Sequence, residues 1–351
     1  MLSRYYLDTN ATAPLHPAAR AAIIDALDAA NPMSPHAAGR EAAMVVDRAR
    51  SAVAALVGRP ARTVFFTSGA TEANAWALSG LRTAARPLVL ASAVEHPSVL
   101  VWADHTIPVD EHGVVNIEAL EELLEELGER LAVVSVMAAN NETGVLQPMA
   151  AIAERVRRAG VLLHCDATQL PGRLRVDVPA DLITVSAHKF GGPKGVGALI
   201  GDIEVAPLLR GGPQERGQRA GTHNVAGIAG MGAAAEQCGV MSPEGRDALE
   251  AMCVRLGGQV LGVGTARLPN TLSVLFPLPG DLVVMALDLA GVCASTGSAC
   301  ASGSSAPSHV LEAMGIRQTA VRLSLSPGQD VRPVLPILEQ VITSMEAACE
   351  W

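Results

Sequence analysis

Short apolar runs alternate with longer helical patterns over the first two-thirds of the chain, which is typical of an α/β protein. The runs are almost continuously apolar, as expected for strands covered by helices on both faces. They predict strands at Thr63–Thr67, Pro87–Ala91, Leu131–Met137, Val161–Cys165, Asp181–Val185 and Gly197–Ile200. Apolar residues at helical spacing predict helices at Glu41–Val57, Glu72–Leu81, Ile117–Leu127 and Ala150–Ala159. The acidic run Glu118–Glu129 is interpreted as the solvated face of one of these helices.

The pattern changes from about residue 245. It predicts a helix at Arg246–Gly257, a strand at Asn270–Phe276, a helix after Gly280, a strand at Ala320–Leu325 and a helix at Pro333–Ala348. We therefore expect two domains. A large α/β domain would span residues 13–245, and a smaller α+β domain would combine residues 1–12 with 246–351. Tyr5–Asn10 is predicted to join the smaller domain or to bridge the two.

Composition excludes several classes of protein. The 351 residues carry a formal charge of −9 and no basic block, which argues against nucleic-acid or membrane-surface binding. Mean hydropathy is positive, at +0.29, but apolar runs such as Leu131–Ala139 fall short of the roughly 18 residues needed to span a membrane. The start of the chain lacks the apolar segment of a signal peptide, so we expect a cytoplasmic protein. Six scattered cysteines without CxxC spacing predict neither a disulfide framework nor a structural zinc site.

Lysine is unusually rare. The chain has 24 arginines and only two lysines, Lys189 and Lys194, five residues apart. Arginine replaces lysine as a surface charge, but it cannot lose its proton and bond to an aldehyde. The two lysines therefore mark a place where a primary amine is needed, unless a bias towards arginine codons explains the count.

Polar clusters follow five of the predicted strands, where ligands of open α/β sheets bind. The clusters are Ser68–Glu72, Glu95–Pro97, Asn140–Gly144, Asp166–Gln169 and Ser186–Lys189. The first also opens a helix, so its small residues and free N–H groups are suited to cradle a phosphate. The alternative is an ordinary helix start capped by the side chain of Ser68 or Thr71.

A phosphate cradle, a carboxylate, an imidazole and a lysine at one sheet edge fit pyridoxal phosphate. Its aldehyde needs an amine, its pyridine nitrogen needs a carboxylate, and its phosphate needs N–H donors. A metal site built from His164, Cys165 and Asp166 is excluded, because neighbouring strand residues point to opposite faces.

Several motifs together resemble the cysteine desulfurases, which are pyridoxal-phosphate enzymes of fold type I in the class V aminotransferase superfamily. The motifs are Ser68–Glu72, Asn140–Glu142, Asp166–Gln169, Ser186–Lys189 with Gly192–Gly195, Arg216–Thr222, Gly297–Cys300 and Arg322–Leu325. The resemblance covers nearly the whole chain and is closer to the NifS/IscS type. It implies a large domain with a mostly parallel seven-stranded sheet and a smaller α+β domain.

The resemblance implies a role for each site residue. Lys189 would bind the cofactor covalently and then move the proton on the substrate Cα, with Lys194 as the competing lysine. Asp166 would pair with the pyridine nitrogen, and His96 would stack on the ring and shuttle protons. Further cofactor contacts would come from Gln169 and Asn141, and phosphate contacts from Ala70, Thr71, Ser186 and His188.

The remaining roles concern the substrate and the assembly. Arg322 would clamp the substrate carboxylate, with Asn141 beside it, because a planar guanidinium suits that task. Thr222 would reach the cofactor phosphate of a neighbouring subunit, which implies a homodimer. Cys300, in a Gly/Ser-rich segment, would attack the sulfur of bound L-cysteine, leaving L-alanine and a persulfide on Cys300 for an acceptor protein.

We therefore expect a cysteine desulfurase that serves iron–sulfur cluster assembly or the thiolation of tRNA or a cofactor. The enzyme alternatives are selenocysteine lyase or another class V activity such as transamination, although a transaminase needs no thiol like Cys300. A non-catalytic scaffold protein is disfavoured because Lys189, Asp166 and His96 are all present. The short C-terminal tail leaves open whether an iron–sulfur scaffold docks.

Overall fold

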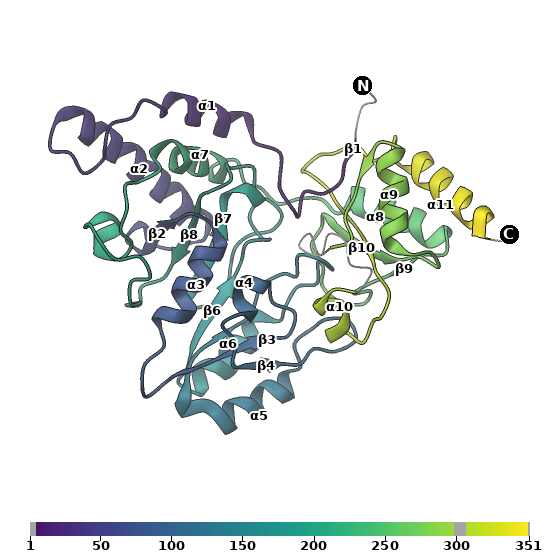
Figure 1. The fold of residues 1–351 in the computed structure, drawn as a ribbon, viewed down its shortest axis with the longest axis horizontal. Helices are drawn as coiled ribbons and strands as arrows, with labels where there is room; N and C mark the ends of the chain where they lie inside the picture. Colours follow the sequence, from purple (N-terminus) through teal and green to yellow (C-terminus); the bar gives the residue numbers. More distant parts are fainter. Residues whose placement is uncertain (1–4, 298–306, 350–351) are drawn as a thin grey trace.

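The computed structural model describes residues 5–297 and 307–349 (Figure 1). Its largest sheet has seven strands in the order β2-β8-β7-β6-β5-β3-β4. The strands are β2 (Val64–Thr67), β3 (Leu88–Ser92), β4 (His105–Ile107), β5 (Leu131–Ser135), β6 (Leu162–Asp166), β7 (Leu182–Ser186) and β8 (Gly197–Ile200). Strand β8 runs antiparallel to both neighbours, and the other pairs are parallel. The predicted α/β fold with a mostly parallel seven-stranded sheet is confirmed.

Helices cover this sheet. They are α1 (Pro17–Asp25), α2 (Ala37–Leu56), α3 (Ala70–Gly80), α4 (Pro97–Leu100), α5 (Ile117–Leu127), α6 (Met149–Arg158) and α7 (Val225–Ala235). Helix α7 packs against α1 and α2, while α3 packs on β7 and β8 (Figure 1). Short 3₁₀ turns are η1 (Ala61–Thr63), η2 (Gly128–Arg130), η3 (Ala187–Lys189) and η4 (Gln214–Gly217). The strands are buried on both faces, as their apolar runs predicted.

Helix α5 shows why the acidic run is helical. Leu120, Leu124 and Leu127 recur every three or four residues and are buried, whereas the glutamates between them face solvent or lie at the boundary. The side chain of Asn116 caps the first turn by accepting a hydrogen bond from the N–H of Ala119. The interpretation of this run as a solvated helix face is confirmed.

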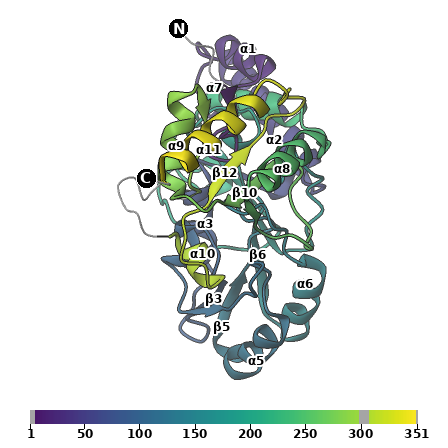
Figure 2. The ribbon, with the colours of Figure 1, turned by 90° about the vertical axis from the view of Figure 1, so that its right-hand side faces the viewer.

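Two smaller sheets and four helices form the other part of the molecule. The sheets pair β12 (Val321–Ser324) with β10 (Thr271–Leu275) and β9 (Gln259–Val260), and β1 (Tyr5–Tyr6) with β11 (Val292–Cys293). The helices are α8 (Glu244–Arg255), α9 (Gly280–Leu289), α10 (His309–Ala313) and α11 (Leu335–Cys349). Helices α9 and α11 lie side by side (Figure 2). This part has an apolar core of its own, separate from the core around the large sheet.

The N-terminal segment touches both parts. Tyr5 and Tyr6 pair with β11, and Asp8 bridges to Ser324 of β12. The chain then crosses to α1, the purple segment in Figure 1. On the way the N–H of Ala13 donates to the carbonyl of His188, beside η3. This segment therefore lies between the seven-stranded sheet and the three-stranded sheet, and contacts both parts of the molecule.

Sequence periodicity did not predict α1, α4, α7, α10 or the short strands β4, β9 and β11. Helix α7 consists largely of glycine and alanine and is buried on nearly all sides, so it has no polar face to set a helical period. In the described parts of the chain, no helix combines the length and the apolar character needed to cross a membrane.

Candidate active site

A cavity of about 710 Å³ lies at the carboxyl ends of the large sheet's parallel strands. It brings together ten of the predicted site residues: Ala70, Thr71, His96, Asn141, Asp166, Gln169, Ser186, His188, Lys189 and Arg322. Thr222 lines a smaller neighbouring cavity, and Cys300 lies outside the described residues.

The start of α3 forms one end of this cavity. Gly69 is the N-cap residue and no side chain bonds the first N–H groups of the helix, so the alternative of a Ser68 or Thr71 cap is wrong. A Cβ on Gly197 of β8 would lie 2.7 Å from the backbone of Gly69, so only glycine permits this approach. Ser186 and His188 line the same cavity from the end of β7. The free N–H groups and the positive end of the helix dipole suit an anion here.

Lys189 projects from η3, directly after β7. Its Nζ donates to the carbonyls of Asn10, at 2.5 Å, and Ala11, at 3.0 Å. Burial, together with the positive charges of Arg322 and Arg173, lowers the pKa of Lys189 to about 8. The competing Lys194 lines the rim and is exposed. The difference in burial favours Lys189 as the reactive amine.

Asp166 is the last residue of β6, is buried and lines the cavity. One carboxylate oxygen accepts from Asn74 Nδ2 at 2.8 Å, and the other accepts from the N–H of Thr168 at 3.0 Å. Burial on the cavity floor leaves this carboxylate available to a cationic ring nitrogen. Thr168 Oγ1 and Gln169 Oε1 are buried and have no hydrogen-bond partner within residues 5–297 and 307–349.

His96 precedes α4 and its side chain lines the cavity. The protein around part of the ring lowers the pKa of His96 by excluding water. The neighbouring Glu95 is fully buried, and burial raises the pKa of its carboxyl well above the usual range. Its Oε1 accepts from the N–H of Met137 at 2.6 Å, so Glu95 supports the backbone behind the cavity.

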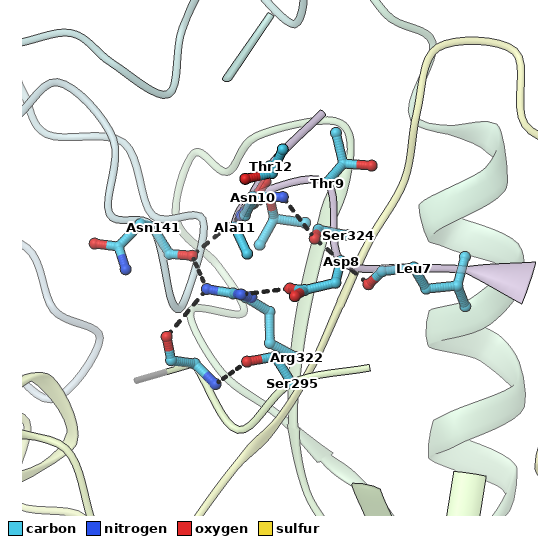
Figure 3. Close-up of polar contacts among 12 residues, drawn as sticks. Leu7, Asp8, Thr9, Asn10, Ala11, Thr12, Asn141, Ser295, Arg322 and Ser324 are labelled. Atoms are coloured by element: carbon cyan, nitrogen blue, oxygen red, sulfur yellow. Dashed lines mark hydrogen bonds and ion pairs between the residues drawn. The ribbon is translucent and has the colours of Figure 1, made fainter. Parts of the chain in front are cut away.

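Arg322 enters the cavity from β12 (Figure 3). Its Nη2 donates to Asp8 at 2.6 Å, while Nη1 donates to the carbonyls of Asn141, at 2.9 Å, and Gly297, at 3.1 Å. Its Nε is buried and has no partner among the described residues. The guanidinium is therefore fixed in place and retains one unused donor.

Asn10 is a site residue that sequence analysis missed. Besides its carbonyl bond to Lys189, its Nδ2 donates to the carbonyl of Asn141 and to Thr271 Oγ1. Its Oδ1 accepts from Arg173, which is buried without a carboxylate partner in the described chain. No motif marks Asn10, because its partners lie more than a hundred residues away.

Glu142 holds two residues that flank the segment containing Cys300. Its Oε2 accepts from Ser308 Oγ at 2.6 Å, and it packs against Gly297, where a Cβ would approach Oε2 to 3.0 Å. Burial raises the pKa of Glu142, although the hydrogen bond from Ser308 opposes the rise. The carboxyl therefore bonds to Ser308 and lies against Gly297, and both of these residues line the cavity.

Thr222 follows a constrained turn. Glu215 and Arg216 both have positive φ, at 45° and 57°, a costly conformation for residues other than glycine. Arg50 forms a bidentate ion pair with Glu215, and His223 also bonds to it. Burial alone would raise the pKa of Glu215, but these bonds lower it to about 2. The network holds the turn, while Thr222 itself remains exposed.

Comparison with known proteins gives this cavity a context. A model of the family described as aminotransferase class-V matches residues 5–334. The chain belongs to this family. It is 41% identical to a cysteine desulfurase of Cereibacter sphaeroides, over 99% of this chain and 97% of that protein. It is 40% identical to a cysteine desulfurase of Rhodobacter capsulatus, over 97% of each chain.

A solved structure described as a NifS-like protein superposes with a TM-score of 0.89. It is 32% identical, over 98% of this chain and 99% of that one. Within the class V aminotransferases, the chain therefore belongs with the cysteine desulfurases, as its motifs suggested. Enzymes of this family depend on pyridoxal phosphate.

The described residues fit that cofactor. The uncapped N–H groups of α3 suit a phosphate, and Lys189 supplies a buried amine of lowered pKa. Asp166 and the unpartnered Oε1 of Gln169 supply polar groups for a ring. These groups line one cavity, and no rearrangement of the chain is needed to bring them together.

Proposed function

We propose that this protein removes sulfur from L-cysteine with the help of pyridoxal phosphate, giving L-alanine and a persulfide on Cys300. The observation that supports this most directly is the environment of Lys189. A primary amine with a pKa of about 8 faces the same cavity as a buried carboxylate and a buried arginine. Such a set is suited to hold an aldehyde cofactor and an amino acid together.

The cofactor would be held from three sides. The N–H groups of Ala70 and Thr71, with Ser186 and His188, would bind its phosphate, and Asp166 would bind its pyridine nitrogen. Gln169 and Asn141 would bind the ring and the substrate side, and His96 would stack on the ring. When bound, the cofactor withdraws electrons from the substrate Cα.

Lys189 Nζ would take the proton from the substrate Cα. Because its pKa is about 8, a useful fraction of the amine is unprotonated near neutral pH. The two backbone carbonyls that accept from Nζ, those of Asn10 and Ala11, hold the amine in place. His96 would move a second proton at its cavity-facing nitrogen.

Arg322 would bind the substrate carboxylate. Asp8 and two backbone carbonyls already orient the guanidinium at the cavity wall. Its positive charge would favour a carboxylate over a neutral group.

Sulfur removal would use the thiolate of Cys300. It attacks the substrate sulfur, a new S–S bond forms, and the C–S bond breaks with its electrons left on the substrate carbon. That carbon then takes up a proton and the product is alanine. The reaction is balanced as cysteine plus a thiol giving alanine plus a persulfide, with no external oxidant. The persulfide sulfur would pass to an acceptor protein for iron–sulfur assembly or thiolation.

The active protein would be a cytoplasmic homodimer in which Thr222 reaches the neighbouring cofactor phosphate. Thr222 is exposed, and its cavity adjoins Ser68 at the start of α3. Large apolar side chains are also exposed on α1, in the turn after it, on α2 and in the segment before Thr222: Ile24, Leu27, Met44, Leu208 and Leu209. Covering them in a dimer would remove apolar surface from water. Sedimentation of wild-type protein and of Leu27→Glu tests this, since only the variant should become monomeric.

Two domains would divide the chain at residues 13–245 and at 1–12 with 246–351. Two separate apolar cores support this division, and the cavity lies where they meet. A single cut near residue 245 would leave residues 1–12, of which Tyr5 and Tyr6 pair with β11, on the large fragment. The test is therefore expression of residues 13–245 alone, which should fold and unfold cooperatively if the boundary is right.

The deciding experiment incubates the holoenzyme and Cys300→Ala with L-cysteine and a reductant, and quantifies alanine, pyruvate and sulfide. Equal alanine and sulfide that depend on Cys300 are expected. Pyruvate in place of alanine would instead show β-elimination, and wild-type sulfide release by Cys300→Ala would disprove the persulfide step.

A further inference from the structure

The imidazole of His96 is oriented by the helix that follows it. His96 is the N-cap residue of α4, and its Nδ1 accepts from the N–H of Ser98 at 3.1 Å. A backbone N–H only donates, so Nδ1 must carry a lone pair in this arrangement. The ring hydrogen of neutral His96 therefore lies on Nε2.

A second set of hydrogen bonds reaches the same nitrogen from the cavity floor. Ser98 Oγ lies 2.8 Å from His96 Nδ1 and accepts from Asn74 Nδ2 at 3.0 Å. The same Nδ2 donates to Asp166 at 2.8 Å. Asn74 and Ser98 are both buried. The bonds form a chain from Asp166 through Asn74 and Ser98 to His96.

The negative charge of Asp166 determines which atom donates in each of these hydrogen bonds. An ionised carboxylate only accepts, so it must face the NH₂ of Asn74 and not its carbonyl oxygen. The same NH₂ occupies a lone pair of the Ser98 hydroxyl. The hydroxyl hydrogen is then free to point at the lone pair of His96 Nδ1.

We propose that Asn74 and Ser98 are positioning residues, which use the negative charge of Asp166 to keep the hydrogen of His96 on the nitrogen that faces the cavity. This rests on the proposed function, which assigns roles to Asp166 and His96. It adds that Asp166 and His96 are linked within the protein through the side chains of Asn74 and Ser98, of which Ser98 lines the cavity. Neither Asn74 nor Ser98 touches the substrate in this role.

Charged groups near His96 and the hydrogen bonds from Ser98 both affect the pKa of its ring. Asp166 of β6 favours the charged ring, while Lys189 of η3 and His309 of α10 disfavour it. The two hydrogen bonds from Ser98 stabilise neutral His96. Removing the hydroxyl should therefore raise the pKa of His96 by about 0.5 to 1 unit.

The direct test is ¹⁵N NMR of the holoenzyme with ¹⁵N-labelled histidine, titrated with acid. The His96→Gln variant identifies the His96 signals. In wild type, neutral His96 should show Nε2 protonated. Ser98→Ala should titrate at higher pH, Asn74→Leu should change in the same direction, and Ser98→Thr, which keeps the hydroxyl, should match wild type.

Ser79→Ala is the matched control. Its hydroxyl bonds to the carbonyl of Ala75 within the same α3 helix that carries Asn74. This control should leave the His96 titration unchanged. Equal His96 pKa values in wild type and Ser98→Ala, or an Nδ1-protonated ring in wild type, would overturn the proposal.

The pH profile of turnover provides a second measurement. The acidic limb of kcat/KM should move to higher pH in Ser98→Ala and return in Ser98→Thr. The NMR result needs no turnover, so it decides the hydrogen-bond chain even if the protein does not desulfurate cysteine. A shifted NMR titration without alanine production would contradict the proposed function alone.

Discussion

The floor and the wall of the cavity are built in different ways. The floor consists of Asp166, Ser186 and Lys189, which lie at or just after the ends of β6 and β7 and take their positions from the large sheet. The wall consists of Asp8, Asn10 and Arg322. Side-chain bonds hold it together, and some join residues 314 positions apart.

This difference teaches which positions tolerate change. Floor residues keep their places because many backbone bonds fix each strand, so a floor substitution should mainly alter chemistry. Wall residues depend on a few charge-assisted bonds, each worth roughly 1.5–3 kcal/mol. A wall substitution should therefore alter geometry and substrate affinity together.

The largest effect is expected at the floor. Lys189→Ala removes the amine that would hold the cofactor and accept the proton, so alanine formation should fall by at least about 10³-fold. Loss of visible cofactor absorbance after gel filtration measures the same change. Lys194→Ala, with its exposed side chain, is the control and should stay within a few-fold of wild type. Equal losses in both variants would refute the assignment.

The next effect is expected at the wall. Arg322→Lys keeps the charge but loses the fork that contacts Asp8, Asn141 and Gly297. We expect kcat/KM for L-cysteine to fall roughly 10- to 100-fold, mostly through KM, because charge-assisted bonds to the substrate weaken. Steady-state kinetics measures this, with the exposed Arg62→Lys as control. An unchanged KM would show that the carboxylate binds elsewhere.

A smaller effect, on the free energy of unfolding, is expected at Gly197 of β8. Gly197→Ala places a Cβ 2.7 Å from the backbone of Gly69, so overpacking should cost about 1–3 kcal/mol in the free energy of unfolding and weaken cofactor binding. Urea denaturation measures the cost. Gly128→Ala is the matched control, since nothing lies within 4 Å of its Cβ. If both variants unfold alike, the close approach is not a constraint.

The smallest effect is a pH dependence of stability at Glu95, behind the cavity. Unfolded Glu95 loses its proton above about pH 4.5, while the buried carboxyl keeps it to higher pH, so stability should decrease as pH rises through that window. The slope is at most about 1.4 kcal/mol per pH unit. Glu95→Gln should remove it, so the variant gains on wild type with rising pH. Urea titrations at several pH values, with exposed Glu118→Gln as control, measure the difference, and parallel curves would contradict it.

The difference between floor and wall also explains which parts of the structure the sequence predicted. The strands and the floor residues follow from local patterns, because a buried parallel strand is apolar on both faces and its polar neighbours mark its end. Glycine-rich α7 gave no such pattern. The residue type alone also did not distinguish Lys189 from Lys194, because the two lysines differ in how far each side chain is exposed.

Apart from Arg322, which the family resemblance identified, the wall and the supports of His96 could not be predicted from local sequence patterns. Asn10, Asn74, Ser98 and Arg173 are ordinary polar residues whose roles depend on distant partners. Asn74, for example, bonds to Asp166, 92 residues later in the chain. Cys300 and Thr222 remain predictions, the first outside the described residues and the second on an exposed turn.

The N-terminal segment that lies between the sheets has a consequence for biosynthesis. Asn10 contacts Lys189 through its carbonyl and Ser324 through its N–H, so its place is complete only when both ends of the chain exist. At a translation rate of about 5–20 residues per second, Lys189 is synthesised roughly 7 to 27 seconds before Ser324. During that interval Arg322, one of the two arginines that lower its pKa, is also missing. The environment that makes Lys189 reactive is therefore completed only after Arg322 and Ser324 have been synthesised.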